Sequence, residues 1–80
     1  MPEWMGIYIS QDGYQYLTDT LGFIGEDYYY FDPEENCWYV NYVELMDFLE
    51  RNNLEWDDST SSIYWANMQP SQKAIFIGVN

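Results

Sequence analysis

The chain has no histidine and a single cysteine, Cys37, among its 80 residues. One cysteine cannot form an internal disulfide, and without histidine the common pairs of a nucleophile and a general base cannot be built. The sequence also has no glycine-rich phosphate loop, no H-E-x-x-H motif and no D-x-[DN]-x-[DN]-G calcium loop. Carboxylate pairs such as Glu34-Glu35 could hold Mg²⁺ or Ca²⁺, but adjacent acids are common in loops. The sequence therefore predicts neither an enzyme nor a protein with a metal or another cofactor.

Basic residues are nearly absent, since Arg51 and Lys73 stand against fourteen Asp and Glu for a formal net charge of -12. Phosphate contacts need Lys and Arg, so the sequence argues against direct binding of nucleic acid. No apolar run approaches the roughly 20 residues that span a bilayer, and anionic lipid repels an acidic surface. The opening Met-Pro-Glu-Trp lacks the basic and apolar regions of a secretion signal. We therefore expect a cytoplasmic protein that does not bind membranes.

Aromatic residues are abundant, with nine Tyr, four Trp and four Phe. A chain of this length forms one domain, residues 1–80, near the size at which a single core only just offsets conformational entropy. Each aromatic side chain can bury on the order of 150–250 Å², so a short chain gains much of its core from such residues. Because 48% of the residues are hydrophobic and no low-complexity run occurs, the chain is expected to fold despite its charge.

The first part of the chain alternates apolar and polar residues, as strands do. Residues 5–9 alternate, Gln11-Asp12-Gly13 is a turn signal, and residues 14–17 resume the alternation, which predicts a first hairpin. Residues 23–24 are expected to continue the sheet.

A second hairpin is predicted next. Residues 28–31 should pair with residues 37–40 across the turn formed by residues 32–36, which contains Pro33 and Asn36.

A helix is predicted from Asn41, an N-cap residue with Glu44 three positions later, which is a capping-box spacing. Its end is expected at Asn52-Asn53. The apolar side of the helical wheel consists of Tyr42, Leu45, Met46 and Leu49, and the opposite side of Glu44, Asp47, Glu50 and Arg51.

The last part of the chain is predicted to return to strands. A polar loop at residues 57–62 precedes a strand at residues 63–68, a turn at residues 69–72 and a last strand at residues 74–79. The predicted fold is therefore α+β: a small antiparallel sheet of about five to six short strands in hairpins, with one amphipathic helix packed on it.

The acidic residues are segregated, because eleven of them lie between residues 26 and 58 and none follows Asp58. They come from a hairpin turn, a helix face and a loop, which could share one side of the domain. On one side of a surface of about 5,000 Å² they would give a carboxylate every ~200 Å². Duplex DNA carries roughly one charge per 100 Å², a density within a factor of about two. This charge distribution favours mimicry of nucleic acid.

The ordinary alternative is a solvated acidic face that keeps the protein soluble. Solubility of a small domain, however, needs a net charge of only about 2 to 8. Because a larger charge destabilises the compact state by self-repulsion, we favour partner binding over solvation alone.

The predicted strand at residues 28–31 would direct Tyr28 and Tyr30 to one face of the sheet, and a single helix cannot cover both faces. Tyrosine often carries binding energy at interfaces, and surrounding acids would steer a basic partner toward it. The predicted partner-binding residues are Glu26, Asp27, Tyr28, Tyr30, Asp32, Glu34, Glu35, Glu44, Asp47 and Glu50.

In size and composition, over its whole length, the sequence resembles small acidic phage-encoded inhibitors of host nucleic-acid enzymes. These include anti-CRISPR proteins, anti-restriction DNA mimics and uracil-DNA glycosylase inhibitors. No motif is shared, so no residue role is carried over. The resemblance implies an inhibitor in the host cytoplasm that binds a basic nucleic-acid-binding protein, a CRISPR effector or another defence or DNA enzyme, and blocks its access to DNA or RNA. The alternative is an acidic structural or assembly protein that forms a homodimer through an aromatic sheet face.

Overall fold

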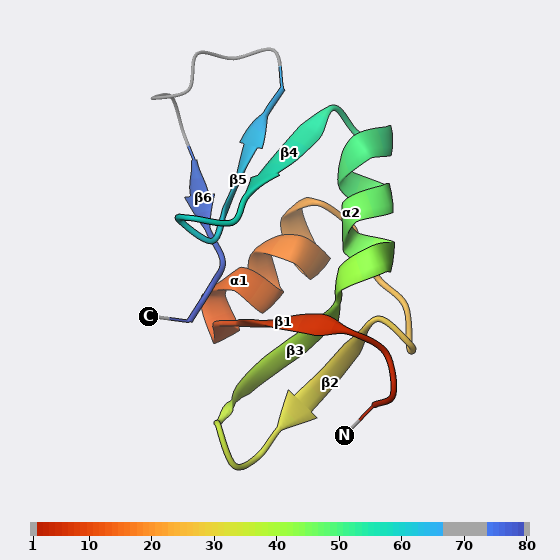
Figure 1. Cartoon of the computed structure of the whole chain (residues 1–80), viewed down its shortest axis with the longest axis vertical. Coiled ribbons are helices and arrows are strands. Elements are labelled where there is room, and N and C mark those ends of the chain that lie inside the picture. The colour runs from red at the N-terminus through yellow and green to blue at the C-terminus, as the bar shows by residue number, and fades with distance from the viewer. Residues whose placement is uncertain (1, 67–73, 80) are drawn as a thin grey trace.

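The computed structural model describes residues 2–66 and 74–79 and has an α+β fold with two antiparallel sheets (Figure 1). The first sheet has the order β1-β3-β2, and its strands are β1 (Gly6–Ile9), β2 (Tyr29–Asp32) and β3 (Cys37–Asn41). The second sheet has the order β4-β5-β6, and its strands are β4 (Leu54–Asp57), β5 (Ser62–Trp65) and β6 (Ile75–Phe76). The helical elements are α1 (Gln11–Gln15), the π-helical turn η1 (Tyr16–Thr20) and α2 (Tyr42–Arg51).

The predicted α+β class is confirmed, and the six strands in residues 2–66 and 74–79 agree with the predicted five to six. The strands are divided between two sheets, however, and α1 is an additional helix. Among the described residues no helix is long and apolar enough to cross a bilayer.

The predicted first hairpin is wrong, because the chain after β1 is helical. Ser10 caps α1, with its hydroxyl oxygen accepting a hydrogen bond from the Gly13 N–H at 2.9 Å. Tyr14 and Leu17 then lie three residues apart on one side of the helical segment. The Tyr14 ring stacks on Trp38 with a centroid separation of 3.8 Å, and Leu17 is fully buried. The helical spacing of these apolar residues therefore prevails over the strand-like alternation.

Gly13 belongs to the interior rather than to a turn. A Cβ atom on this residue would lie 2.5 Å from the carbonyl oxygen of Ile77 and 2.8 Å from its Cα. The glycine therefore allows α1 to approach the C-terminal segment.

The predicted second hairpin is confirmed. β2 pairs with β3 in a continuous antiparallel register from Tyr29 opposite Val40 to Asp32 opposite Cys37. Asn36 in the turn has a φ of 54°, a conformation that Asn tolerates better than most residues. The predicted strand at residues 23–24 is wrong, because no strand forms there.

Helix α2 begins and ends where the sequence predicts. The Asn41 side-chain oxygen accepts a hydrogen bond from the Glu44 N–H at 3.1 Å, which completes the predicted N-cap. After the last turn, Asn53 has a φ of 61°, the left-handed conformation that commonly ends helices. Leu45 and Leu49 are buried, so the predicted apolar side faces the core.

The region after α2 contains a strand that the sequence analysis missed. β4 pairs with β5 from Leu54 opposite Trp65 to Asp57 opposite Ser62. β5 overlaps the predicted strand at residues 63–68, and β6 lies within the predicted strand at residues 74–79. The predicted turn at residues 69–72 lies outside the described residues.

The C-terminal segment joins the two sheets. β6 pairs with β5, whereas Gly78 forms an isolated antiparallel bridge with Ile9 at the end of β1. The Ser10 N–H donates to the Ile77 carbonyl at 2.8 Å, and the Ile77 N–H donates to the Ser61 carbonyl at 3.0 Å. Figure 1 shows α1 between the two sheets and α2 beside them. Both sheets, the π-helical turn η1 and helix α2 contribute to one core, made of Ile9, Leu17, Phe23, Val40, Leu45, Leu49, Leu54, Ile63 and Ile77.

Candidate partner-binding surface

The first sheet has one face in the core and one face turned away from it. Ile9 of β1 and Val40 of β3 are fully buried on the inner face, where Trp38 stacks on Tyr14 of α1. Because side chains alternate along a strand, Tyr8, Tyr39 and Tyr30 point to the other face. The register sets Tyr8 opposite Tyr39 and Tyr39 opposite Tyr30, so these tyrosines form a row across the three strands. With Trp4, which stacks on Tyr39, they form what we call the outward face, and all four are half-buried.

Three rings of the outward face, those of Trp4, Tyr8 and Tyr39, hold one another in place. Trp4 and Tyr39 stack with centroids 5.4 Å apart and planes 8° apart, and Tyr8 packs on Tyr39 with centroids 4.9 Å apart. The Gly6 N–H donates to the Tyr39 hydroxyl oxygen at 2.8 Å. An ordered aromatic surface loses little side-chain entropy on binding, so this face is suited to contact another molecule.

Asp32 supports the hairpin. One carboxylate oxygen accepts hydrogen bonds from the N–H groups of Glu34 at 3.0 Å and Glu35 at 3.2 Å. The other accepts a hydrogen bond from the Tyr8 hydroxyl at 3.0 Å. With a relative exposure of 9%, Asp32 offers a partner little surface, unlike the other carboxylates predicted with it.

These hydrogen bonds change the proton affinity of both groups. Desolvation raises the pKa of Asp32, but the hydrogen bonds from the Glu35 N–H, the Tyr8 hydroxyl and the Glu34 N–H outweigh it, and the pKa is lowered. The hydrogen bond to Asp32, with a smaller effect of desolvation, raises the pKa of Tyr8 to about 12. Asp32 is therefore a carboxylate, and Tyr8 a neutral donor, at physiological pH.

The tip of the β2–β3 hairpin carries exposed acids beside the outward face. Glu34 and Glu35 are both exposed, and their position is fixed by the bonds to Asp32. Tyr30, Asp32, Pro33 and Glu34 line a shallow hollow of about 260 Å³. The hairpin thus brings Tyr30 together with Glu34, two of the residues predicted to bind a partner.

The turn before β2 contains the next three predicted residues. Glu26 and Asp27 are exposed in a turn that the Tyr28 N–H closes by donating to the Gly25 carbonyl at 3.2 Å. The Tyr28 ring stacks on the buried Phe23 with centroids 4.6 Å apart. Tyr28 therefore packs against the core, which leaves Tyr30 as the predicted tyrosine on the outward face.

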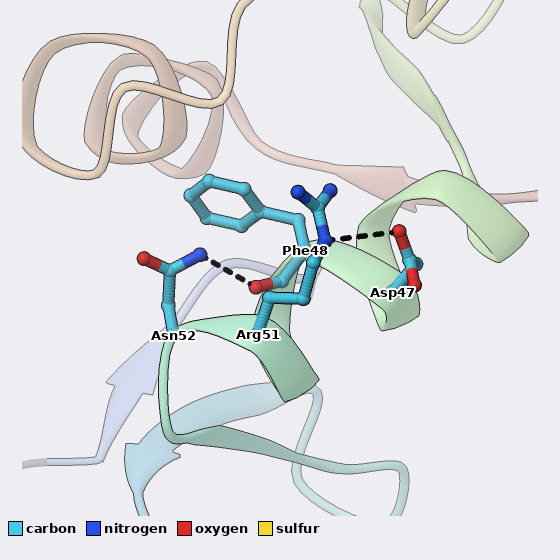
Figure 2. Close-up of polar contacts among 4 residues, drawn as sticks. All are labelled: Asp47, Phe48, Arg51 and Asn52. Carbon is cyan, nitrogen blue, oxygen red and sulfur yellow. Dashed lines mark hydrogen bonds and ion pairs between the residues drawn. The ribbon is translucent and has the colours of Figure 1, made fainter.

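The acids of α2 lie apart from the hairpin tip. Asp47 and Glu50 are exposed and Glu44 is partly buried. Figure 2 shows Asp47 paired with Arg51, whose Nε lies 3.1 Å from the carboxylate, one turn along the helix. In the chain, β3 lies between the hairpin turn and α2. The length of this strand, about 17 Å, therefore separates the acids of the hairpin tip from those of α2.

Averaged over the whole surface, the acids are spaced more widely than the charges of duplex DNA. The chain exposes 5375 Å², close to the area expected for its mass. Divided among the fourteen acids, this area gives about 380 Å² per carboxylate, against roughly 100 Å² per charge on duplex DNA. The average charge density is therefore about a quarter of that of duplex DNA.

Trp4, Tyr8 and Tyr39 of the outward face are not among the residues predicted from the sequence to bind a partner. Alternation places Tyr8 and Tyr39 opposite Ile9 and Val40 on their strands, but only the pairing of β1 with β3 brings the two tyrosines together. In residues 2–66 and 74–79 no group of three or more Cys, Asp or Glu side chains is arranged to hold a metal ion.

Comparisons with protein-family models, with curated proteins and with solved structures found no match to this chain.

Proposed function

We propose that this protein is an inhibitor that binds a basic nucleic-acid-binding protein, foremost a CRISPR effector, and blocks its access to DNA or RNA. The observation that carries the proposal is the outward aromatic face with Glu34 and Glu35 at its border. Interfaces of this composition combine a centre of Tyr and Trp with a charged rim.

The charge of the molecule supports a basic partner. Of the fourteen acids, eleven are exposed, and within the described part of the chain the one ion pair joins Asp47 to Arg51. A surface with so few internal counter-charges attracts cationic proteins over long range and accelerates their encounter with it.

The inhibition we propose is local mimicry at the hairpin. The carboxylates of Glu34 and Glu35 would take the place of phosphates opposite Lys and Arg of the partner, while the ring of Tyr30 packs against the partner's surface. The average charge density is about a quarter of that of DNA, so the carboxylates alone would bind a basic partner weakly. The aromatic rings of the outward face would supply the remaining affinity.

The test begins with capture of partners from host lysate at low and high salt, followed by kinetics with the purified basic protein and a gel-shift assay of its DNA or RNA binding. Changing Glu34 and Glu35 together to Gln should slow association and weaken its salt dependence, because rim charges mostly set the on-rate. Tyr30→Ala should shorten the lifetime of the complex and cost about 2 kcal/mol or more. Unchanged rates for both variants at low salt would contradict the proposal.

Two matched variants separate binding from folding. Tyr28→Ala should lower the melting temperature, because its ring packs on Phe23. Glu50→Gln removes one exposed charge from α2, away from the hairpin. It should slow association with the partner less than Glu34→Gln does.

A homodimer is the second candidate, because the outward face is a row of half-buried aromatic rings against which a second copy could pack. Two such copies would each bring a charge of -12 to the contact. Light scattering should therefore report a monomer at physiological salt. A dimer that Tyr30→Ala dissociates would favour the homodimer instead.

A further inference from the structure

The first sheet has an open edge at β2. The other edge, β1, is bridged to the C-terminal segment through Ile9 and Gly78, whereas β2 is the last strand in the order β1-β3-β2. The Asn41 N–H donates to the Tyr28 carbonyl at 2.8 Å, so the pair Tyr28 and Asn41 is hydrogen-bonded.

Hydrogen-bonded pairs alternate along an antiparallel ladder. Tyr30 and Asp32 therefore direct their backbone N–H and C=O groups to β3, and Tyr29 and Phe31 direct theirs to the open edge. Among the described residues, no other segment makes a hydrogen bond to the backbone of Tyr29 or Phe31. This edge has backbone donors and acceptors in the arrangement that an added strand needs.

The side chains at this edge are apolar in the middle and acidic beyond both ends. Phe31 is 39% exposed and packs edge-on against Trp38 with centroids 5.2 Å apart. The exposed acids Glu26 and Asp27 precede β2, and the exposed acids Glu34 and Glu35 follow it. β2 contains neither a lysine nor a proline, two residue types that protect natural sheet edges from pairing.

We propose that the β2 edge binds an extended basic segment of the partner protein as a fourth strand of the first sheet. This inference rests on the proposed function and specifies how the partner is held. Main-chain hydrogen bonds to Tyr29 and Phe31 supply the docking, and Lys or Arg at either end of the added segment face the two acid pairs. A second copy of this chain is the wrong occupant, because antiparallel pairing of two β2 strands would set the acid pairs of one copy against those of the other.

Amide exchange with a defined peptide tests this directly. The probe is a short peptide with β-branched residues in its middle and arginines at both ends, and its control has glutamates in place of the arginines. In the complex with the basic peptide, the Tyr29 and Phe31 amides should exchange at least about tenfold more slowly. The open edge of β4 is the control. There the Ala66 N–H donates to the Asn53 carbonyl, so the backbone N–H groups of Leu54 and Trp56 point away from β5. Exchange of these two amides should not change.

A backbone variant gives a second readout. Phe31→Pro removes an N–H that β3 does not use, so the variant should fold and lose the peptide, whereas Phe31→Ala keeps the N–H and should weaken binding less. If Phe31→Pro does not fold, the exchange measurement alone decides.

Three results would overturn the inference: no binding of the basic peptide, binding without protection of Tyr29 and Phe31, or full binding by a folded Phe31→Pro variant. Equal binding of the acidic peptide would contradict the charge argument. None of these results bears on whether the Glu34 and Glu35 variants lose inhibition of the whole partner, so failure of strand addition is distinguishable from failure of the proposed function.

Discussion

At the scale of single residues, Asp32 couples the hairpin turn to the outward face through Tyr8. Its folded-state pKa is lower than in the unfolded chain, so its contribution to stability is present above the unfolded pKa. The contribution is lost as the pH falls through the folded value. Asp32→Asn should therefore lower the melting temperature at neutral pH, and the difference between wild type and variant should shrink in acid. Melting curves from pH 7 to about pH 2 measure it; a difference that is constant with pH would mean that the carboxylate charge does not matter.

Gly13 gives a second prediction at this scale. In most helices Gly→Ala is stabilising, by about 1 kcal/mol. Here the new methyl group would meet the backbone of Ile77, so we expect Gly13→Ala to destabilise the protein, with an overpacking cost of about 1–3 kcal/mol. Gln15→Ala, an exposed position of the same helix, is the matched control and should be close to neutral. Chemical denaturation of both variants decides, and a stabilised Gly13→Ala would mean that α1 shifts to make room.

At the scale of elements, the N-cap of α2 lies where the sequence predicts it. Asn41→Ala removes the acceptor of the Glu44 N–H and should lower the free energy of unfolding by about 1 kcal/mol. Asn41→Asp keeps the acceptor and should retain most of the stability. Urea denaturation compares the two, and equal loss in both would show that Asn41 acts through its β3 position rather than as a cap.

The sequence predicts α2 correctly and α1 wrongly because α2 is specified by local signals, whereas α1 depends on a contact with a distant part of the chain. The cap at Asn41 and the apolar spacing of Leu45 and Leu49 are both local, so the sequence alone predicts this helix. In residues 11–17 the sequence fits both a helix and a hairpin. The contact of Gly13 with Ile77, far away along the chain, favours the helix, and no local pattern contains that contact.

The same distinction applies to the candidate surface. Exposure of Glu34 and Glu35 follows from a local turn signal and could be predicted. The outward face needs β1 to pair with β3, a pairing between distant segments, so its tyrosine row could not be recognised before the register was known. The separation of the α2 acids from the hairpin is also a consequence of topology, since β3 lies between them.

At the scale of the whole molecule, self-repulsion opposes the fold. Eleven of the acids are exposed, and among the described residues only Asp47 forms an ion pair, with Arg51. That pair is on the surface and contributes little to stability, so most carboxylates have no nearby counter-charge. Added NaCl shortens the screening length from about 10 Å at 0.1 M to about 3 Å at 1 M, so it should weaken repulsion and raise the melting temperature.

A charge-reduced variant shows whether screening is the cause of that rise. Glu26→Gln combined with Asp27→Asn removes two exposed charges from one turn without touching the core, so its melting temperature should start higher at low salt and rise less as NaCl is added. An uncharged osmolyte should stabilise wild type and variant alike, because it acts through exclusion from the protein surface rather than through charge. A wild-type melting temperature that stays flat or falls as NaCl increases would mean that the acids are paired or too far apart to repel. The excess charge would then carry no cost in stability, and the argument that it is kept for a basic partner would lose its physical basis.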